Sequence, residues 1–199
     1  IQEQAMKEHL QNRKPFKIIQ SEGAASGMVN GLAVVGFPGT EGRSAGEAFP
    51  VVAEVFPIDE PKGPRAENFI VTGTLKDSDS WVQDSKQHVR AAILKMYGKD
   101  IMEDYKTFIS FAQQHNVEGP SAGVAMTLAI MSRLGDPRIL PPETRQPIAI
   151  RQDVAVTGTI ELIPTPLDPR DVRVGSIGGV PDKVKGAANA GCKYVVIPQ

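Results

Sequence analysis

β-Branched and apolar residues predict two strands near the start of the chain, at 28–37 (MVNGLAVVGF) and 48–56 (AFPVVAEVF). A glycine-rich connection, 38–47, separates them. The two strands are therefore expected to pair as an antiparallel hairpin with a long tip. A third strand is predicted over 68–75 (NFIVTGTL).

Two helices with different patterns follow. Over 79–97, apolar residues recur at steps of three and four, which predicts an amphipathic helix ended by Gly98. Residues 121–134 are apolar on nearly every side, so this helix is expected to be buried. Pro120 suits its first position, where the missing N–H costs nothing. A strand at 107–112 lies between the two helices.

The C-terminal part predicts a strand at 153–160, a short helix at 181–190 and a last strand at 193–198. Two proline-bearing insertions, 138–152 and 164–174, are expected as loops between them. Strands come first, and helix and strand then alternate. This order favours an α+β or mixed α/β fold over a doubly wound Rossmann sheet.

The first residues have a polar helical pattern that Pro15 ends. We predict a linker helix over 1–14 that leads from an upstream module, followed by one domain over 15–199. Because the chain opens at Ile1 inside this pattern, we expect it to be a segment of a longer polypeptide.

Composition narrows the classes of function. The 199 residues carry 22 basic and 23 acidic side chains, a net charge of −1, so nucleic acid is not expected as a partner. The single cysteine, Cys192, excludes an intrachain disulfide framework and a thiolate metal cluster. The longest nearly apolar run, 123–131, is too short to span a membrane. Cys192, Trp81 and the methionines are interpreted as packing residues.

Ser121 is the candidate nucleophile, because small residues surround it in the segment EGPSAG (118–123). Another backbone can approach its hydroxyl closely, and a helix N-terminus offers free N–H donors for an oxyanion. The alternative is that Ser121 only caps the helix.

A serine nucleophile needs a base. His9 and His88 lie on polar helical segments, and His115 precedes Ser121 in an expected surface loop, so a histidine base is poorly supported. A buried lysine can act instead, because desolvation lowers its pKa. Lys183 lies in the first turn of the 181–190 helix; it is the candidate base, unless it is exposed or forms an ion pair with Asp182.

These segments resemble the three signature motifs of the Lon protease proteolytic domain. In order, they are EGPSAG (118–123), VAVTG (154–158) and GGVPDK (178–183). The resemblance extends upstream over GMVNGLAV (27–34) and PVVAEV (50–55) and covers nearly the whole chain. The residues of these segments are closer to those of the B-type Lon of archaea and some bacteria than to those of the common bacterial A-type.

The resemblance implies the Lon proteolytic-domain fold, which is similar to domain 2 of ribosomal protein S5. It also implies that Ser121 is the nucleophile and Lys183 its general base, with no histidine. Thr157 would orient the lysine amine, and Glu118 and Glu54 would be supporting groups near the site, although an ordinary ion pair or cap is an equal alternative for both acids.

Backbone around the serine would form the oxyanion hole. The segment concerned comprises Gly119, Pro120 and Ala122. The two insertions fall between the motifs, so they leave the expected dyad in place.

The resemblance further implies an endopeptidase that cleaves unfolded polypeptides. No metal or cofactor is expected in this chain; because no Walker-type loop is present, ATP and Mg²⁺ would act in an upstream AAA+ module. The parent enzyme would be a cytoplasmic homo-hexamer, with any membrane anchor upstream and no membrane contact by this chain. Two alternatives are a non-catalytic Lon-like scaffold in an AAA+ assembly and a serine enzyme that uses His115.

Overall fold

The computed structural model describes residues 24–36, 44–58, 68–73, 80–112, 119–163, 165 and 171–199. The linker helix predicted over 1–14 lies outside these ranges.

A six-stranded mixed sheet forms the centre of the domain, in the order β10-β7-β2-β3-β5-β4. The strands are β2 (Met28–Gly36), β3 (Ser44–Pro57), β4 (Phe69–Gly73), β5 (Tyr105–Phe111), β7 (Val154–Val156) and β10 (Tyr194–Val196). The predicted hairpin is confirmed, since β2 and β3 pair antiparallel along their length. By contrast, β7 lies parallel to both β2 and β10, and β4 lies parallel to β5.

Two small two-stranded sheets complete the strand pairing. One joins β1 (Ala24–Ala25) to β6 (Ile150–Arg151), and the other joins β8 (Thr159–Leu162) to β9 (Val172–Gly175), both antiparallel. The loop prediction for 164–174 was wrong in its last part, because 172–174 belong to β9. Likewise, the insertion 138–152 ends in β6.

The single strand predicted over 153–160 was also wrong. It divides at Thr157-Gly158 into β7 and β8, which belong to different sheets. The break has a physical cause, since backbone groups here bond the start of the buried helix. The Gly158 N–H donates to the Ser121 carbonyl at 3.0 Å, and the Val124 N–H donates to the Gly158 carbonyl at 3.1 Å.

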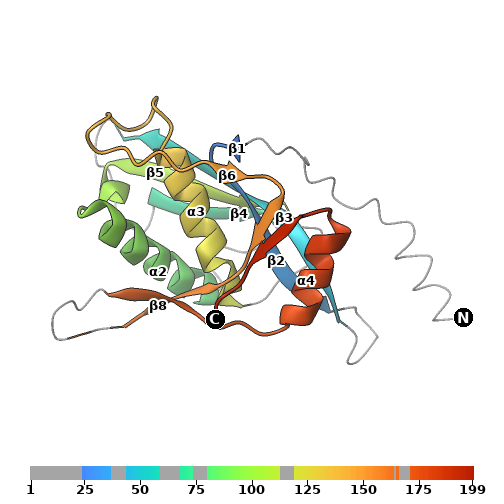
Figure 1. The fold of residues 1–199 in the computed structure, drawn as a ribbon. Helices are drawn as coiled ribbons and strands as arrows, with labels where there is room; N and C mark the ends of the chain where they lie inside the picture. Colours follow the sequence, from blue (N-terminus) through green and yellow to red (C-terminus); the bar gives the residue numbers. More distant parts are fainter. Residues whose placement is uncertain are drawn as a thin grey trace, which may run out of the picture.

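Helices cover both faces of the sheet. They are α2 (Ser80–Tyr97), α3 (Gly123–Leu134) and α4 (Val180–Asn189), with short 3-10 turns at Ile101–Glu103 and Pro120–Ala122. In Figure 1, α2 and α3 lie side by side, and α4 lies apart from them beside β2 and β3. The expected mixed class of fold is therefore confirmed.

Successive side chains of β2 and β3 point to opposite faces of the sheet, so neighbouring residues pack against different helices. Ala33 and Phe49 are buried in the large core with Met126 and Ile130 of α3, which confirms that the helix is buried. Leu32 and Ala48 belong to a second, smaller core with Ala187 of α4. Successive side chains of a strand point to opposite faces, so α3 and α4 pack on opposite sides of the hairpin.

The packing of α4 depends on two glycines. A Cβ atom built at Gly46 of β3 would lie 1.7 Å from the Asp182 carbonyl oxygen, and one at Gly186 would lie 2.4 Å from the Gly46 carbonyl carbon. Any side chain at either position would push the two backbones apart. The position of α4, and of Lys183 in its first turn, is therefore set by this close contact with β3.

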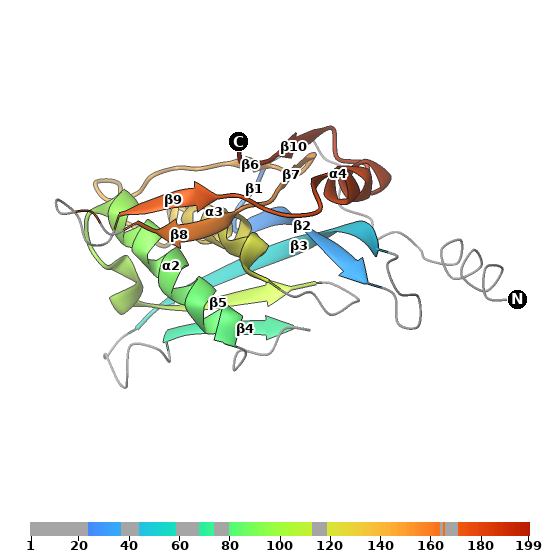
Figure 2. The ribbon, with the colours of Figure 1, turned by 90° about the horizontal axis from the view of Figure 1, so that it is seen from below.

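The β8–β9 hairpin crosses α2 (Figure 2) and packs against it. Lys95 of α2 forms an ion pair with Asp171, which directly precedes β9. The hairpin thereby holds Thr159 and Glu161 beside the first turns of α2.

Candidate active site

Ser121 is the middle residue of the 3-10 turn Pro120–Ala122 that leads directly into α3. The turn begins after Gly119, whose φ of 96° lies in the region that favours glycine. The residues that cap the turn and α3 are Gly119 and Ala122, and neither cap involves a side-chain hydrogen bond. Ser121 is therefore not the capping residue that the alternative interpretation required.

The break after β7 holds the serine backbone in place. The Ser121 carbonyl accepts the Gly158 N–H at 3.0 Å and the Thr157 hydroxyl at 3.4 Å. Thr157 is in turn tied to the last strand, because its N–H donates to the Val196 carbonyl at 3.1 Å. The parallel strands β7 and β10 thus fix the segment that contains Ser121 at their carboxyl ends.

Lys183 is buried, with only 3% of its surface exposed. Its amine donates a hydrogen bond to the Thr157 hydroxyl at 3.1 Å. Burial lowers the pKa of Lys183 below its usual 10.5, because removal from water disfavours the charged ammonium. The alternative that Lys183 is a solvated surface lysine is wrong.

The carboxylate of Asp182, the preceding residue, does not counteract the lowering of the Lys183 pKa. Asp182 accepts a hydrogen bond from the Ser44 hydroxyl at 3.1 Å. Among the described residues, no carboxylate forms an ion pair with Lys183. The environment of the amine therefore shifts its protonation equilibrium toward the neutral form, which is the form that a general base needs.

Thr157 connects the two candidate groups. Its hydroxyl oxygen accepts the Lys183 N–H and its proton points to the Ser121 carbonyl. Within the described ranges, the amine's hydrogen-bond partner is this threonine and not the Ser121 hydroxyl. Thr157 therefore fixes where the Lys183 amine lies. A candidate base and nucleophile need to come into contact only when substrate binds, so this geometry is compatible with the predicted roles.

Both candidate side chains, those of Ser121 and Lys183, line a cavity of about 430 Å³. Its other walls come from the end of β2, the start of β3, and the segment before α4, namely Ala33, Val34, Ser44, Gly119, Pro120, Thr159, 176–179 and Asp182. The structure therefore brings together two residues that are more than sixty positions apart in the sequence.

Of the two predicted supporting acids, the structure describes Glu54 and not Glu118. Glu54 is exposed on β3 opposite Phe108, and it does not line this cavity. Ten residues of strand separate it from Ser44, which corresponds to about 30 Å. Glu118, His9 and His115 lie outside the described residues. His88 is half-buried on α2 and lines a different, smaller cavity.

Some residues of the site carried no sequence signal. Ser44, Val34 and Ile177 line the cavity only because β2, β3 and α4 meet there. They belong to no reactive residue pattern, and nothing in their spacing indicates that they lie beside Ser121.

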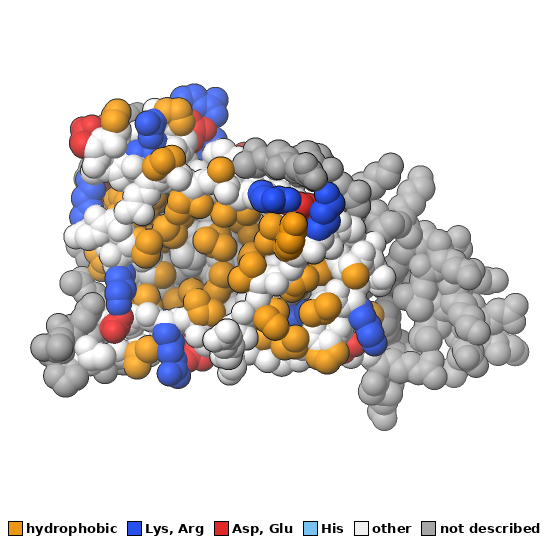
Figure 3. All heavy atoms as spheres, viewed as in Figure 1, with side chains coloured by type: hydrophobic (Ala, Val, Ile, Leu, Met, Phe, Trp, Pro, Cys, Tyr) orange, Lys and Arg blue, Asp and Glu red, His pale blue; other side chains and the backbone are white. Residues whose placement is uncertain are grey.

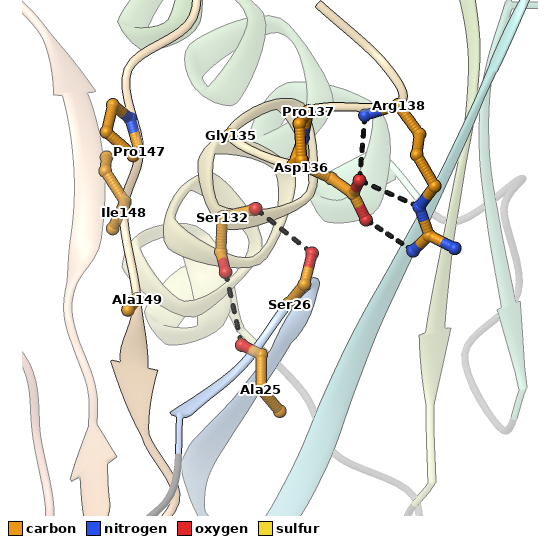
Figure 4. A pocket seen from close by; sticks show the side chains of 10 residues that line it. All are labelled: Ala25, Ser26, Ser132, Gly135, Asp136, Pro137, Arg138, Pro147, Ile148 and Ala149. Atoms are coloured by element: carbon orange, nitrogen blue, oxygen red, sulfur yellow. Dashed lines mark hydrogen bonds and ion pairs between the residues drawn. The ribbon is translucent and has the colours of Figure 1, made fainter.

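Another cavity, with a volume of about 470 Å³, lies at the C-terminal end of α3 (Figure 4). Its polar groups bond one another. The Ser26 hydroxyl donates to the Ser132 carbonyl at 3.3 Å, and Arg138 donates to both oxygens of Asp136 and keeps the pKa of that carboxyl far below its usual range. This cavity joins β1 to α3 and holds no candidate nucleophile with a base.

The described ranges contain no group of three or more histidine, cysteine or acidic side chains that could hold a metal ion. In the same ranges, no helix is long and apolar enough to cross a membrane.

Comparison with known proteins identifies what the chain resembles. The family of Lon protease (S16) C-terminal proteolytic domains matches residues 1–199. The chain is 33% identical over 201 residues to the archaeal Lon protease of Thermoplasma acidophilum, covering 100% of this chain and 26% of that protein. It is 32% identical over 196 residues to the archaeal Lon protease of Thermococcus kodakarensis, covering 96% of this chain and 25% of that protein. For Archaeoglobus fulgidus the identity is 32% over 200 residues, covering 100% and 27%. The chain thus spans about a quarter of the length of these relatives, and the archaeal likeness is confirmed.

Proposed function

Because this chain belongs to the Lon protease (S16) proteolytic-domain family, whose members are serine endopeptidases, we propose that Ser121 and Lys183 form a catalytic dyad. The observation that carries the proposal is the buried Lys183 amine. It has a lowered pKa, bonds Thr157 at 3.1 Å, and shares a cavity with Ser121.

The reaction follows from these groups. The neutral amine of Lys183 takes the proton from the Ser121 hydroxyl, and the serine oxygen attacks the peptide carbonyl. The peptide C–N bond then breaks, and the ammonium of Lys183 gives its proton to the leaving amine. Water, deprotonated by the same lysine, releases the acyl group from Ser121.

The oxyanion formed during this attack needs N–H donors. The 3-10 turn around Ser121 provides them at the entry of α3, where the helix dipole also favours negative charge. Pro120 has no N–H and cannot be one of these donors, so its role is to set the turn. Gly119 and Ala122 remain candidates.

The proposal is tested with a serine-directed fluorophosphonate, followed by mass spectrometry. We expect one adduct, on Ser121. Its rate of formation should rise with pH through the folded-state pKa of Lys183, because below that pKa the amine is protonated and cannot accept a proton. His115→Ala should leave this profile unchanged. A profile that His115→Ala alters would favour the histidine alternative, and an adduct on another serine would refute the proposal.

Replacing Thr157 by valine should lower kcat about 10²-fold with little change in KM, because the amine loses the acceptor that positions it. Thr157→Ser keeps the hydroxyl and should restore most of the activity. Steady-state kinetics on a fluorogenic peptide measure both. If the serine variant were as slow as the valine variant, the hydroxyl would not be the group that matters.

The remaining assignments concern the whole enzyme. The archaeal relatives are about four times as long as this chain, and we infer that an AAA+ module elsewhere in such an enzyme uses ATP and Mg²⁺ to deliver unfolded polypeptides. The B-type resemblance supports a cytoplasmic position, with any tether in that upstream part. The scaffold alternative is disfavoured, because a scaffold has no need for a buried lysine beside a serine.

We infer self-association, as a hexamer in the full enzyme, and exposed apolar side chains support a contact surface on this domain. Apolar side chains gather on the face shown in Figure 3. Among the described residues, exposed large apolar side chains in the C-terminal part of the chain include Val184, Tyr194, Val196 and Ile197, which are between 41% and 54% exposed. Exposed apolar patches of this kind mark contact surfaces between proteins.

A further inference from the structure

A second cavity adjoins the proposed active site and has no role in the dyad. Its volume is about 210 Å³, and we call it the α2 cavity. It is lined by Trp81, Asp84, Ser85, His88, Pro120, Thr159, Ile160 and Glu161. Pro120 and Thr159 also line the cavity that holds Ser121 and Lys183. The two cavities therefore share a wall directly beside the nucleophile.

The walls of the α2 cavity differ in chemistry. Trp81, Pro120 and Ile160 supply apolar surface. Glu161 is already engaged, since it accepts a hydrogen bond from Arg173 at 3.0 Å and from the Thr159 hydroxyl at 3.4 Å. Asp84 is exposed, and it makes no hydrogen bond or ion pair within the ranges that the structure describes. Its carboxylate is available to a ligand.

A buried hydroxyl in the same wall lacks a partner. Ser85 is only 3% exposed, and among the described residues its Oγ has no hydrogen-bond partner. Buried polar atoms are normally bonded, because an unmade hydrogen bond carries the cost of desolvation. A bound group that donates hydrogen bonds would remove this deficit.

We propose that the α2 cavity is a specificity pocket that receives a lysine or arginine side chain of the polypeptide substrate, close to the scissile bond. This inference rests on the proposed function. A basic side chain has an apolar stem, which would pack on Trp81 and Ile160, and a charged end that donates hydrogen bonds. The end would reach Asp84 and Ser85, and the indole ring of Trp81 adds a cation-π surface.

The position of the pocket agrees with how an extended chain binds. Pro120 is adjacent to Ser121, so the pocket begins one residue from the attacking oxygen. In an extended peptide, side chains on one face repeat about every 7 Å. A residue within one or two positions of the attacked carbonyl can therefore place its side chain in the α2 cavity.

Trp81 allows this pocket to be tested without catalysis, because it is the only tryptophan of the 199 residues. The chain carrying Ser121→Ala is titrated with peptides that differ at one position, which is lysine, norleucine or glutamate. The lysine peptide should bind about tenfold more tightly than the norleucine peptide, as for one charge-assisted hydrogen bond, and should shift the Trp81 emission. Moving the variable residue along the peptide identifies its distance from the scissile bond.

A second experiment reverses the charge of Asp84 in the pocket. Asp84→Lys should remove the preference for the lysine peptide over the norleucine peptide. Glu143→Lys makes the same change of net charge on an exposed residue outside the pocket and serves as the control. In the chain with Ser121 intact, competition between lysine and norleucine peptides should give the same order of preference.

The outcomes separate this inference from the proposed function. If the intact chain cleaves both peptides equally well, and Asp84→Lys changes neither rate, the pocket assignment is overturned while the dyad stands. If Ser121→Ala binds lysine peptides with the expected Trp81 signal, the pocket is supported even where the dyad assignment fails.

Discussion

Replacing Lys183 by glutamine is expected to lower the kcat of peptide hydrolysis by about 10³-fold or more, which is the usual loss when the proton acceptor of a serine nucleophile is removed. Glutamine keeps much of the side-chain volume and can still bond the Thr157 hydroxyl. It has no basic nitrogen, so the Ser121 proton has no acceptor. Kinetics on a fluorogenic peptide measure the loss.

The same variant should fold. Burial of the charged Lys183 ammonium destabilises the folded chain, and this is why the pKa of Lys183 is lowered. The destabilisation is greatest at pH values below the folded-state pKa, where the buried amine is protonated. The free energy of unfolding therefore depends on pH in a defined direction. Stability rises with pH from the folded pKa to the unfolded pKa, because the unfolded chain binds the proton more tightly. Glutamine carries no charge, so this dependence on pH should disappear, as urea unfolding at several pH values would reveal.

Lys185 provides the matched control, because it is exposed two residues further along α4. Lys185→Gln should leave kcat within about twofold of the unchanged chain, as is usual for surface substitutions. A Lys183→Gln chain that is folded and retains its full activity would disprove the dyad, and with it the present interpretation of the cavity.

A change far from the reacting atoms should have the second largest effect. In Gly46→Ala, the added Cβ would lie 1.7 Å from the Asp182 carbonyl oxygen and 2.8 Å from the backbone nitrogen of Lys183. The two backbones must separate, which should cost about 1–3 kcal/mol of unfolding free energy. Because α4 carries Lys183, we also expect kcat to fall about 10²-fold, as for a displacement of about 1 Å.

Gly36→Ala is the control for this prediction. Gly36 lies on the partner strand, β2, and pairs in register with Ser44, but a Cβ there meets no atom within 4 Å. Its stability should change by less than about 0.5 kcal/mol. Equal stability and equal kcat for the two alanine variants would show that the contact between β3 and α4 does not position Lys183.

Several local features could be predicted from the sequence. Alternation and apolar runs located the β2–β3 hairpin, and apolar residues on every side of 121–134 indicated a buried helix. Pro120 marked where the turn before that helix begins. These predictions succeed because they depend on periodicity and on backbone constraints that act over a few residues.

The division of 153–160 into β7 and β8 could not be predicted in this way. Its residues read as one strand, and only the bonds between Gly158 and the segment of Ser121 separate the two halves. The same holds for β9, which the sequence places in an insertion. Its pairing with β8 is a contact between strands, and local residue preferences contain no information about it.

The sequence alone determined most of the helices and strands, the mixed class of fold, and the identity of Ser121, Thr157 and Lys183 as residues that match a known set of motifs. Only the tertiary structure decided that the Lys183 amine is buried and that it bonds Thr157. It also decided that Glu54 lies far along β3 from the cavity of Ser121 and Lys183. The reason is that a side chain loses its water through neighbours brought from distant parts of the chain. Here those neighbours arrive because Gly46 lets α4 press against β3.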